Sequence, residues 1–91
     1  MRQYEIGMLV QSKSGHDQGT VYVIMDMQGE YLFLVDGTIK KMSNPKKKNK
    51  KHVQRIDYVL PEFMDLYQND AIRDDYIKRQ IKLFKKQETL S

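Results

Sequence analysis

The 91-residue chain contains no cysteine, no tryptophan and only two prolines. The lack of cysteine excludes disulfide bonds, thiolate nucleophiles and metal sites built on thiolates. The longest stretch without a charged residue covers the eight positions 18–25, which is far too short to cross a bilayer. The first residues, Met1 to Glu5, include no apolar segment of the kind that a signal peptide requires. We therefore expect a cytoplasmic protein that does not enter a membrane.

Motifs of common enzymes are missing as well. The chain has no phosphate-binding Gly-x-x-x-x-Gly-Lys-Ser/Thr loop, no nucleophile elbow and no His-Glu-x-x-His pattern. The two histidines, His16 and His52, lack a third ligand at metal spacing. Asp74 and Asp75 are adjacent carboxylates, but they fall on the charged side of a predicted helix, where burial does not tune them for acid–base catalysis. We expect a non-catalytic protein without a cofactor, a metal or a small-molecule substrate.

Positive charge is concentrated in one part of the chain. The net charge is +4, but the window 37–56 contains eight basic residues and no acidic residue. Its centre, 43–52, combines five lysines with polar residues and Pro45, so we expect an unpacked basic loop. Such a loop binds a polyanion by neutralising phosphates and releasing counterions. The candidate phosphate contacts are Lys40, Lys41, Lys46, Lys47, Lys48, Lys50, Lys51 and Arg55.

The first sixty residues read as short strands separated by turns. Strands are predicted over residues 6–12, 20–27, 31–35, 38–42 and 52–58, mainly from their alternating or continuous apolar patterns. Asp36-Gly37 is a hairpin signal that predicts the return of the chain into the fourth strand. The number and spacing of the strands are typical of a small barrel or sandwich. We therefore predict a mainly β domain over 1–60 and a helical extension over 61–91.

The extension carries the clearest periodic pattern of the chain. A helical turn near Pro61 and a longer helix from Asn69 or Asp70 to Gln87 are predicted. One side of this helix is apolar and the opposite side is charged. We expect the apolar side, Ile72, Tyr76, Ile77, Ile81, Leu83 and Phe84, to pack on the outside of the barrel. The partners expected there are Tyr22, Ile24, Leu32 and Leu34, which would otherwise be an exposed apolar patch.

The glycine loop at 14–19 allows two interpretations. Gly15 and Gly19 either let the loop approach an RNA backbone closely or simply occupy turn positions with positive φ. His16 is either an exposed turn residue or a contact for a base or a phosphate, and Asp17 is expected to stabilise its own turn. The aromatic residues nearby are expected mainly in the core, with base stacking as the alternative; they are Tyr22, Tyr31 and Phe33.

The order of these segments resembles a known family. The strand, glycine loop and strand over 7–24 resemble a KOW motif. The similarity narrows to small bacterial KOW-domain RNA-binding proteins, which are related to a KOW-type large-subunit ribosomal protein of archaea and eukaryotes. It rests on Leu-Val-Asp-Gly at 34–37, Asn-Pro-Lys-Lys-Lys-Asn at 44–49 and Lys-His-Val at 51–53. The resemblance covers residues 5–56 and implies a five-stranded SH3-like barrel that binds structured RNA, in the first place ribosomal RNA.

We therefore expect a monomeric RNA-binding protein whose partner is ribosomal RNA or the ribosome. The alternative is a protein-interaction adapter whose basic loop or C-terminal helix docks an acidic partner protein. Lysines suit phosphates as point charges, whereas bidentate recognition of carboxylates favours arginine. Besides the phosphate contacts named above, the candidate RNA-binding residues are Lys13, Gly15, His16, Gly19, Asn44 and His52.

Overall fold

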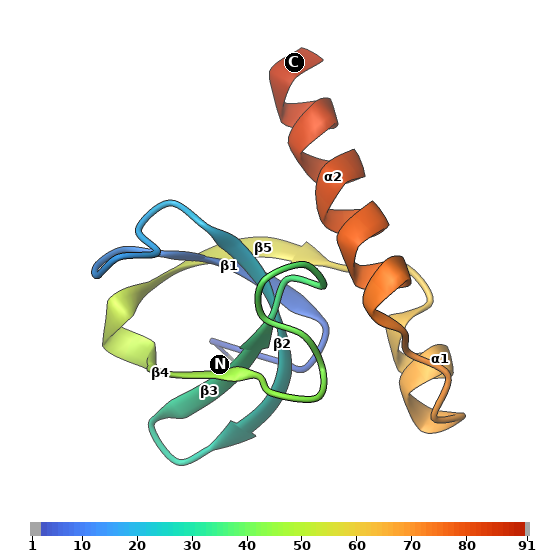
Figure 1. Cartoon of the computed structure of the whole chain (residues 1–91), viewed down its shortest axis with the longest axis horizontal. Helices are drawn as coiled ribbons and strands as arrows, with labels where there is room; N and C mark the ends of the chain where they lie inside the picture. Colours follow the sequence, from blue (N-terminus) through green and yellow to red (C-terminus); the bar gives the residue numbers. More distant parts are fainter. Residues whose placement is uncertain (1–2, 91) are drawn as a thin grey trace.

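A computed structural model describes residues 3–90 as five antiparallel strands followed by two helices (Figure 1). The strands are β1 (Met8–Ser12), β2 (Val21–Gln28), β3 (Tyr31–Val35), β4 (Lys46–Asn49) and β5 (Val53–Val59). A 3-10 turn, η1 (Lys50–His52), lies between the last two strands, and the helices are α1 (Phe63–Gln68) and α2 (Asp74–Leu90). The prediction of a mainly β chain with a C-terminal helix is confirmed. Among the described residues, no helix is long and apolar enough to span a membrane.

All five strands belong to one sheet in the order β4-β3-β2-β1-β5. The edges are β4 and β5, which follow each other in sequence and are joined only by the three residues of η1. Because so short a connection must bridge the two edges, the sheet curls strongly around its inner face (Figure 1). No ladder joins β4 to β5 within residues 3–90, so the sheet is open. The closed five-stranded barrel that the sequence predicts is therefore not confirmed.

The two faces of the sheet bury two separate apolar clusters. The inner cluster consists of Met8, Val10, Tyr22, Ile24, Leu32, Leu34 and Val53. The outer cluster lies under the helices and consists of Leu9, Val21, Val23, Val35, Leu60, Phe63, Ile72, Ile77, Ile81 and Phe84. The prediction that α2 covers Tyr22, Ile24, Leu32 and Leu34 is therefore wrong. Successive strand residues alternate between faces, and α2 packs on the opposite set.

The predicted strand over 38–42 is also wrong, because this segment is irregular. The Oδ1 atom of Asp36 accepts hydrogen bonds from the backbone N–H groups of Thr38 and Lys40, at 2.9 and 2.8 Å. Gly37, with φ of 80°, packs so closely on α2 that a Cβ atom there would lie 2.9 Å from the backbone nitrogen of Lys78. The segment thus holds the start of α2, and the edge of β3 is left for β4.

Strand β4 lies within 43–52, the segment that the sequence predicts as an unpacked loop. It pairs with β3 in a register that places Lys46 opposite Leu34 and Lys48 opposite Leu32. The prediction of an unpacked loop is therefore wrong for these residues. Lysines suit an edge strand, because charged side chains discourage pairing with a further strand.

Helix α2 begins at Asp74, later than the predicted Asn69 or Asp70. Asn69 instead ends α1, since its Nδ2 donates to the carbonyl of Asp65 at 2.7 Å, and Asp70 has a positive φ of 54°. The predicted apolar side of α2 is confirmed for Ile77, Ile81 and Phe84, all buried against the sheet. It is wrong for Leu83, which remains 47% exposed.

Candidate nucleic-acid interface

The structure brings the glycine loop and the lysine segment together. The Lys48 ammonium donates to the carbonyl of Ser14 and to Oδ1 of Asp17, both at 3.0 Å. The Lys13 backbone N–H donates to the carbonyl of His52 at 2.8 Å, and the His52 Nδ1 lies 3.2 Å from the Ser14 hydroxyl. Two segments that are more than thirty positions apart in the sequence therefore form one continuous surface.

Asp17 is the centre of this junction. Its Oδ1 accepts a hydrogen bond from the Ser12 hydroxyl at 2.9 Å, and its Oδ2 accepts one from the Tyr22 hydroxyl at 2.7 Å. Its Oδ2 also lies 3.8 Å from the Lys46 ammonium. Within the turn, the backbone carbonyl of Asp17 accepts the Thr20 N–H, a bond that any residue could make, so the prediction that Asp17 stabilises its own turn is not confirmed for its side chain. The side chain instead joins β1, β2 and β4.

These contacts change the acidity of two groups. Burial alone would raise the pKa of the Asp17 carboxyl, but the hydrogen bonds from Tyr22, Lys48 and Ser12 outweigh burial and hold it far below its ordinary value. Burial, together with the hydrogen bond to Asp17, raises the pKa of the Tyr22 hydroxyl. Asp17 is therefore a permanent negative charge under physiological conditions, and it neutralises part of the lysine segment.

The alternation of β4 sorts its lysines into two groups. Lys46 and Lys48 point toward Asp17, and their side chains are 33% and 10% exposed. Lys47 points to the opposite side and is exposed, with its ammonium 4.5 Å from the ring centroid of Tyr31. Lys48 is therefore mainly a structural residue, whereas Lys47 presents its charge to solvent.

The turn η1 adds two more cations at the end of β4. Lys51 is exposed, and its backbone N–H is held by the Asn49 side chain at 3.0 Å. The Lys50 ammonium lies 5.8 Å from the ring centroid of Tyr4. Tyr4 is absent from the sequence-based site, and nothing in the local sequence signals its position, because it is 46 residues from Lys50. Each aromatic ring next to a lysine adds a surface on which a base can stack.

The aromatic residues of β2 and β3 differ in how deeply they are buried. Tyr22 is buried, Phe33 is half-buried and Tyr31 is 42% exposed. The expectation of a core position is therefore confirmed for Tyr22 and wrong for Tyr31. The Tyr31 ring is therefore exposed for stacking, with the Lys47 ammonium beside it.

Arg55 lies on β5, beyond the turn. Its Nε is 3.1 Å from Oδ1 of Asp57, and its Nη1 donates to the carbonyl of Gln3 at 3.3 Å. The Asp57 side chain is 80% exposed, so this ion pair is solvated and weak. Arg55 can leave Asp57 for a phosphate at little cost.

Two further predicted residues, His16 and Lys40, lie around a hollow beside the lysine segment. This hollow has a volume of about 280 Å³, and its lining includes His16, Asp17, Ile39, Lys40 and Lys46. His16 is exposed, which is compatible with either interpretation of this residue, and Ile39 is an apolar side chain that is 81% exposed. The hollow extends the cationic surface from β4 to the turn after β3.

Other members of the predicted site are placed by their backbone. Gly15 and Gly19 have φ values of 91° and 93°, so both occupy the positive-φ turn positions that the sequence indicates. The Asn44 N–H donates to the carbonyl of Lys41 at 2.9 Å, and both side chains are exposed. Residues 3–90 contain no group of three or more histidine and acidic side chains that could hold a metal ion.

A scan against models of protein families finds no match for this chain, and a search of curated proteins finds no similar sequence.

Proposed function

We propose that this chain is a non-catalytic RNA-binding protein related to the small bacterial KOW-domain proteins, and that it binds ribosomal RNA through the phosphate backbone. One observation carries the proposal: three of the eight cations in 37–56 have an acidic partner in the described structure, and five do not. The five lysines without one are Lys40, Lys41, Lys47, Lys50 and Lys51.

The elements that carry these lysines are well held. Lys47 belongs to the hydrogen-bonded ladder between β3 and β4, and the backbone of Lys50 donates to the carbonyl of Glu30 at 2.9 Å. The backbone of Lys40 is held by Asp36. Cations on such supports lose little backbone entropy when they bind, so they suit a ligand with regularly spaced charges. RNA is such a ligand, and phosphate contacts position a protein on it without reading the bases.

The fold supports the same proposal. Five antiparallel strands, a strong curl and a three-residue connection between the two edges are compatible with an SH3-like arrangement. The glycine loop lies between β1 and β2, where a KOW motif places it. The exposed Tyr31 ring beside Lys47 favours RNA over an acidic protein, because unpaired bases stack on aromatic side chains.

A competition experiment tests the proposal against the adapter alternative. The purified chain is titrated with a labelled RNA hairpin, and either unlabelled RNA or polyglutamate of equal total charge is added as competitor. We expect RNA to compete strongly and polyglutamate weakly. RNA that co-purifies from a lysate should also be lost after nuclease or high salt. Equal competition by polyglutamate would instead identify a docking site for acidic proteins.

A further inference from the structure

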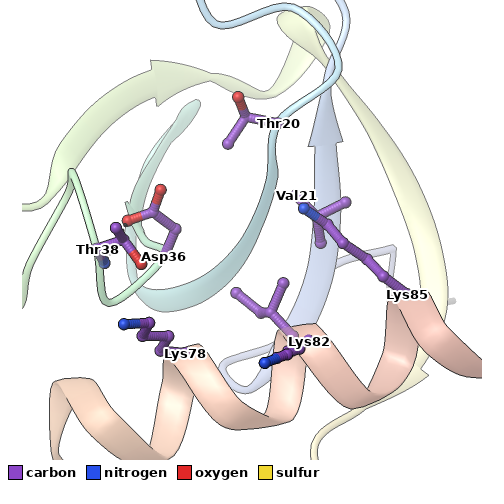
Figure 2. A pocket seen from close by; sticks show the side chains of 8 residues that line it. Thr20, Val21, Asp36, Thr38, Lys78, Lys82 and Lys85 are labelled. Carbon is purple, nitrogen blue, oxygen red and sulfur yellow. Dashed lines mark hydrogen bonds between the residues drawn. The ribbon is translucent and has the colours of Figure 1, made fainter.

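A second hollow lies between the sheet and α2, next to the first. Its volume is about 240 Å³. Three lysines of α2 lie along one side of it, and Asp36, Thr38 and Thr20 lie across from them (Figure 2). Thr20 and Asp36 line both hollows, so the two adjoin. The two hollows therefore lie side by side between Lys46 on β4 and α2.

The lysines along this hollow are Lys78, Lys82 and Lys85. Their spacing of four and three residues places them in one row on the same face of the helix. The row extends about 10 Å along the helix axis at 1.5 Å per residue. A nucleic-acid backbone also carries its charges in a row, so the lysine row can face successive phosphates.

An amphipathic helix normally carries charge on its solvent side, so lysines on α2 are not by themselves a site. The position of this row is what distinguishes it. The turn that carries Lys40 touches the same part of α2, because Gly37 packs on the backbone of Lys78. The turn and the helix that carry these cations are therefore held together by direct packing.

The charges around the second hollow suit an anion. Lys78 and Lys82 alone outnumber Asp36, the one acidic residue in the lining. Asp36 is also engaged with the turn, since its Oδ1 accepts the N–H groups of Thr38 and Lys40. The hydroxyl groups of Thr20 and Thr38 can exchange hydrogen bonds with ribose hydroxyls.

We propose that the RNA backbone continues from the lysine segment across both hollows onto α2, where Lys78, Lys82 and Lys85 bind a second set of phosphates. The inference rests on the proposed RNA binding and extends it. It gives α2 a binding role in addition to covering the outer cluster of the sheet. It also predicts that the full binding site requires an RNA long enough to reach from β4 to the helix.

Two charge-matched variants test the inference. Lys78→Gln/Lys82→Gln removes two cations of the row, whereas Arg79→Gln/Lys86→Gln removes two exposed cations about a quarter turn away. Glutamine keeps a high helix propensity, so both should fold. Binding of a labelled RNA hairpin is measured over a salt series. We expect the first variant to reduce the slope of log affinity against log salt by about 1.5. The control should leave the slope almost unchanged.

A second measurement uses the wild-type sequence, so it does not depend on whether a variant folds. Lysine acetylation is mapped by mass spectrometry with and without the RNA hairpin. RNA should protect Lys78 and Lys82 but not Lys86. The wild-type chain could bind RNA while both variants show the same salt slope and neither Lys78 nor Lys82 is protected. That result would overturn the proposal that the lysines of α2 bind phosphates, but not the proposed RNA binding. If the wild-type chain does not bind RNA at all, both are overturned.

Discussion

The Lys48 ammonium lies 3.0 Å from Oδ1 of Asp17, and the two side chains are only 10% and 15% exposed. This pair joins the glycine loop to an edge strand that begins 29 positions later in the chain. It also separates the lysines of this segment by function. Lys48 joins β4 to the glycine loop through Asp17, whereas the exposed Lys47 and Lys51 can bind a ligand.

Replacing Asp17→Asn should lower the free energy of unfolding by about 1–3 kcal/mol, because Lys48 loses the carboxylate that balances its buried charge. Urea denaturation measures the loss. The matched control is Lys51→Gln at an exposed position, which should change stability by less than about 0.5 kcal/mol. The double variant Asp17→Asn/Lys48→Met should lose less than the sum of the two single variants. Simple additivity would show that the two side chains are not coupled.

The Asp17 contacts also predict how stability depends on pH. The pKa of this carboxyl is lowered in the folded chain, whereas an unfolded aspartate has a pKa of about 3.9. The stabilisation is therefore complete above about pH 5 and is lost as the pH falls below about 4 toward the folded pKa. We expect the difference in unfolding free energy between the wild type and Asp17→Asn to shrink over this range. A difference that stays constant on acidification would contradict the assignment.

Gly37→Ala should destabilise the chain by about 2–4 kcal/mol, since alanine is strained at positive φ and its Cβ would press on the first turn of α2. Gly29→Ala is the control, because Gly29 also has a positive φ, 59°, but has open space around it. The control should cost only about 1–2 kcal/mol. Thermal unfolding followed by circular dichroism separates the two. Equal losses would mean that the turn does not anchor the helix.

Packing of α2 on the sheet is tested by a second matched pair. Ile77 is fully buried in the outer cluster, so Ile77→Ala should cost about 2–5 kcal/mol. Leu83 lies on the same helix but is 47% exposed, and Leu83→Ala should cost less than about 1 kcal/mol. Denaturant unfolding measures both. A larger effect at Leu83 than at Ile77 would contradict this packing of α2 on the sheet.

Much of the fold follows from local patterns. The periods of two and 3.6 residues predict a mainly β chain and an apolar helix side that includes Ile77 and Ile81. Which side of the sheet the helix covers does not follow, because β2 is apolar on both faces and a single strand cannot show which face meets α2. The close contact between Gly37 and the helix, which accompanies this arrangement, is a tertiary feature that no local pattern shows.

The candidate site was predictable in composition but not in arrangement. A run of lysines such as 46–48 predicts a solvated loop, because like charges repel and no apolar side chain is present. The structure instead uses the alternation of a strand to turn Lys48 toward Asp17 and Lys47 toward solvent. The acid that makes this possible is 31 residues away, and no local pattern connects it to the run.

The salt dependence of RNA binding tests the central claim most directly. The variant Lys47→Gln/Lys50→Gln/Lys51→Gln removes three cations without an acidic partner and leaves the pair between Lys48 and Asp17 in place. With four to six phosphates contacted, the wild type should show a slope of about −3 to −5 for log affinity against log salt. The variant should fold normally and lose about two to three units of that slope. An unchanged affinity and slope in the folded variant would contradict the account.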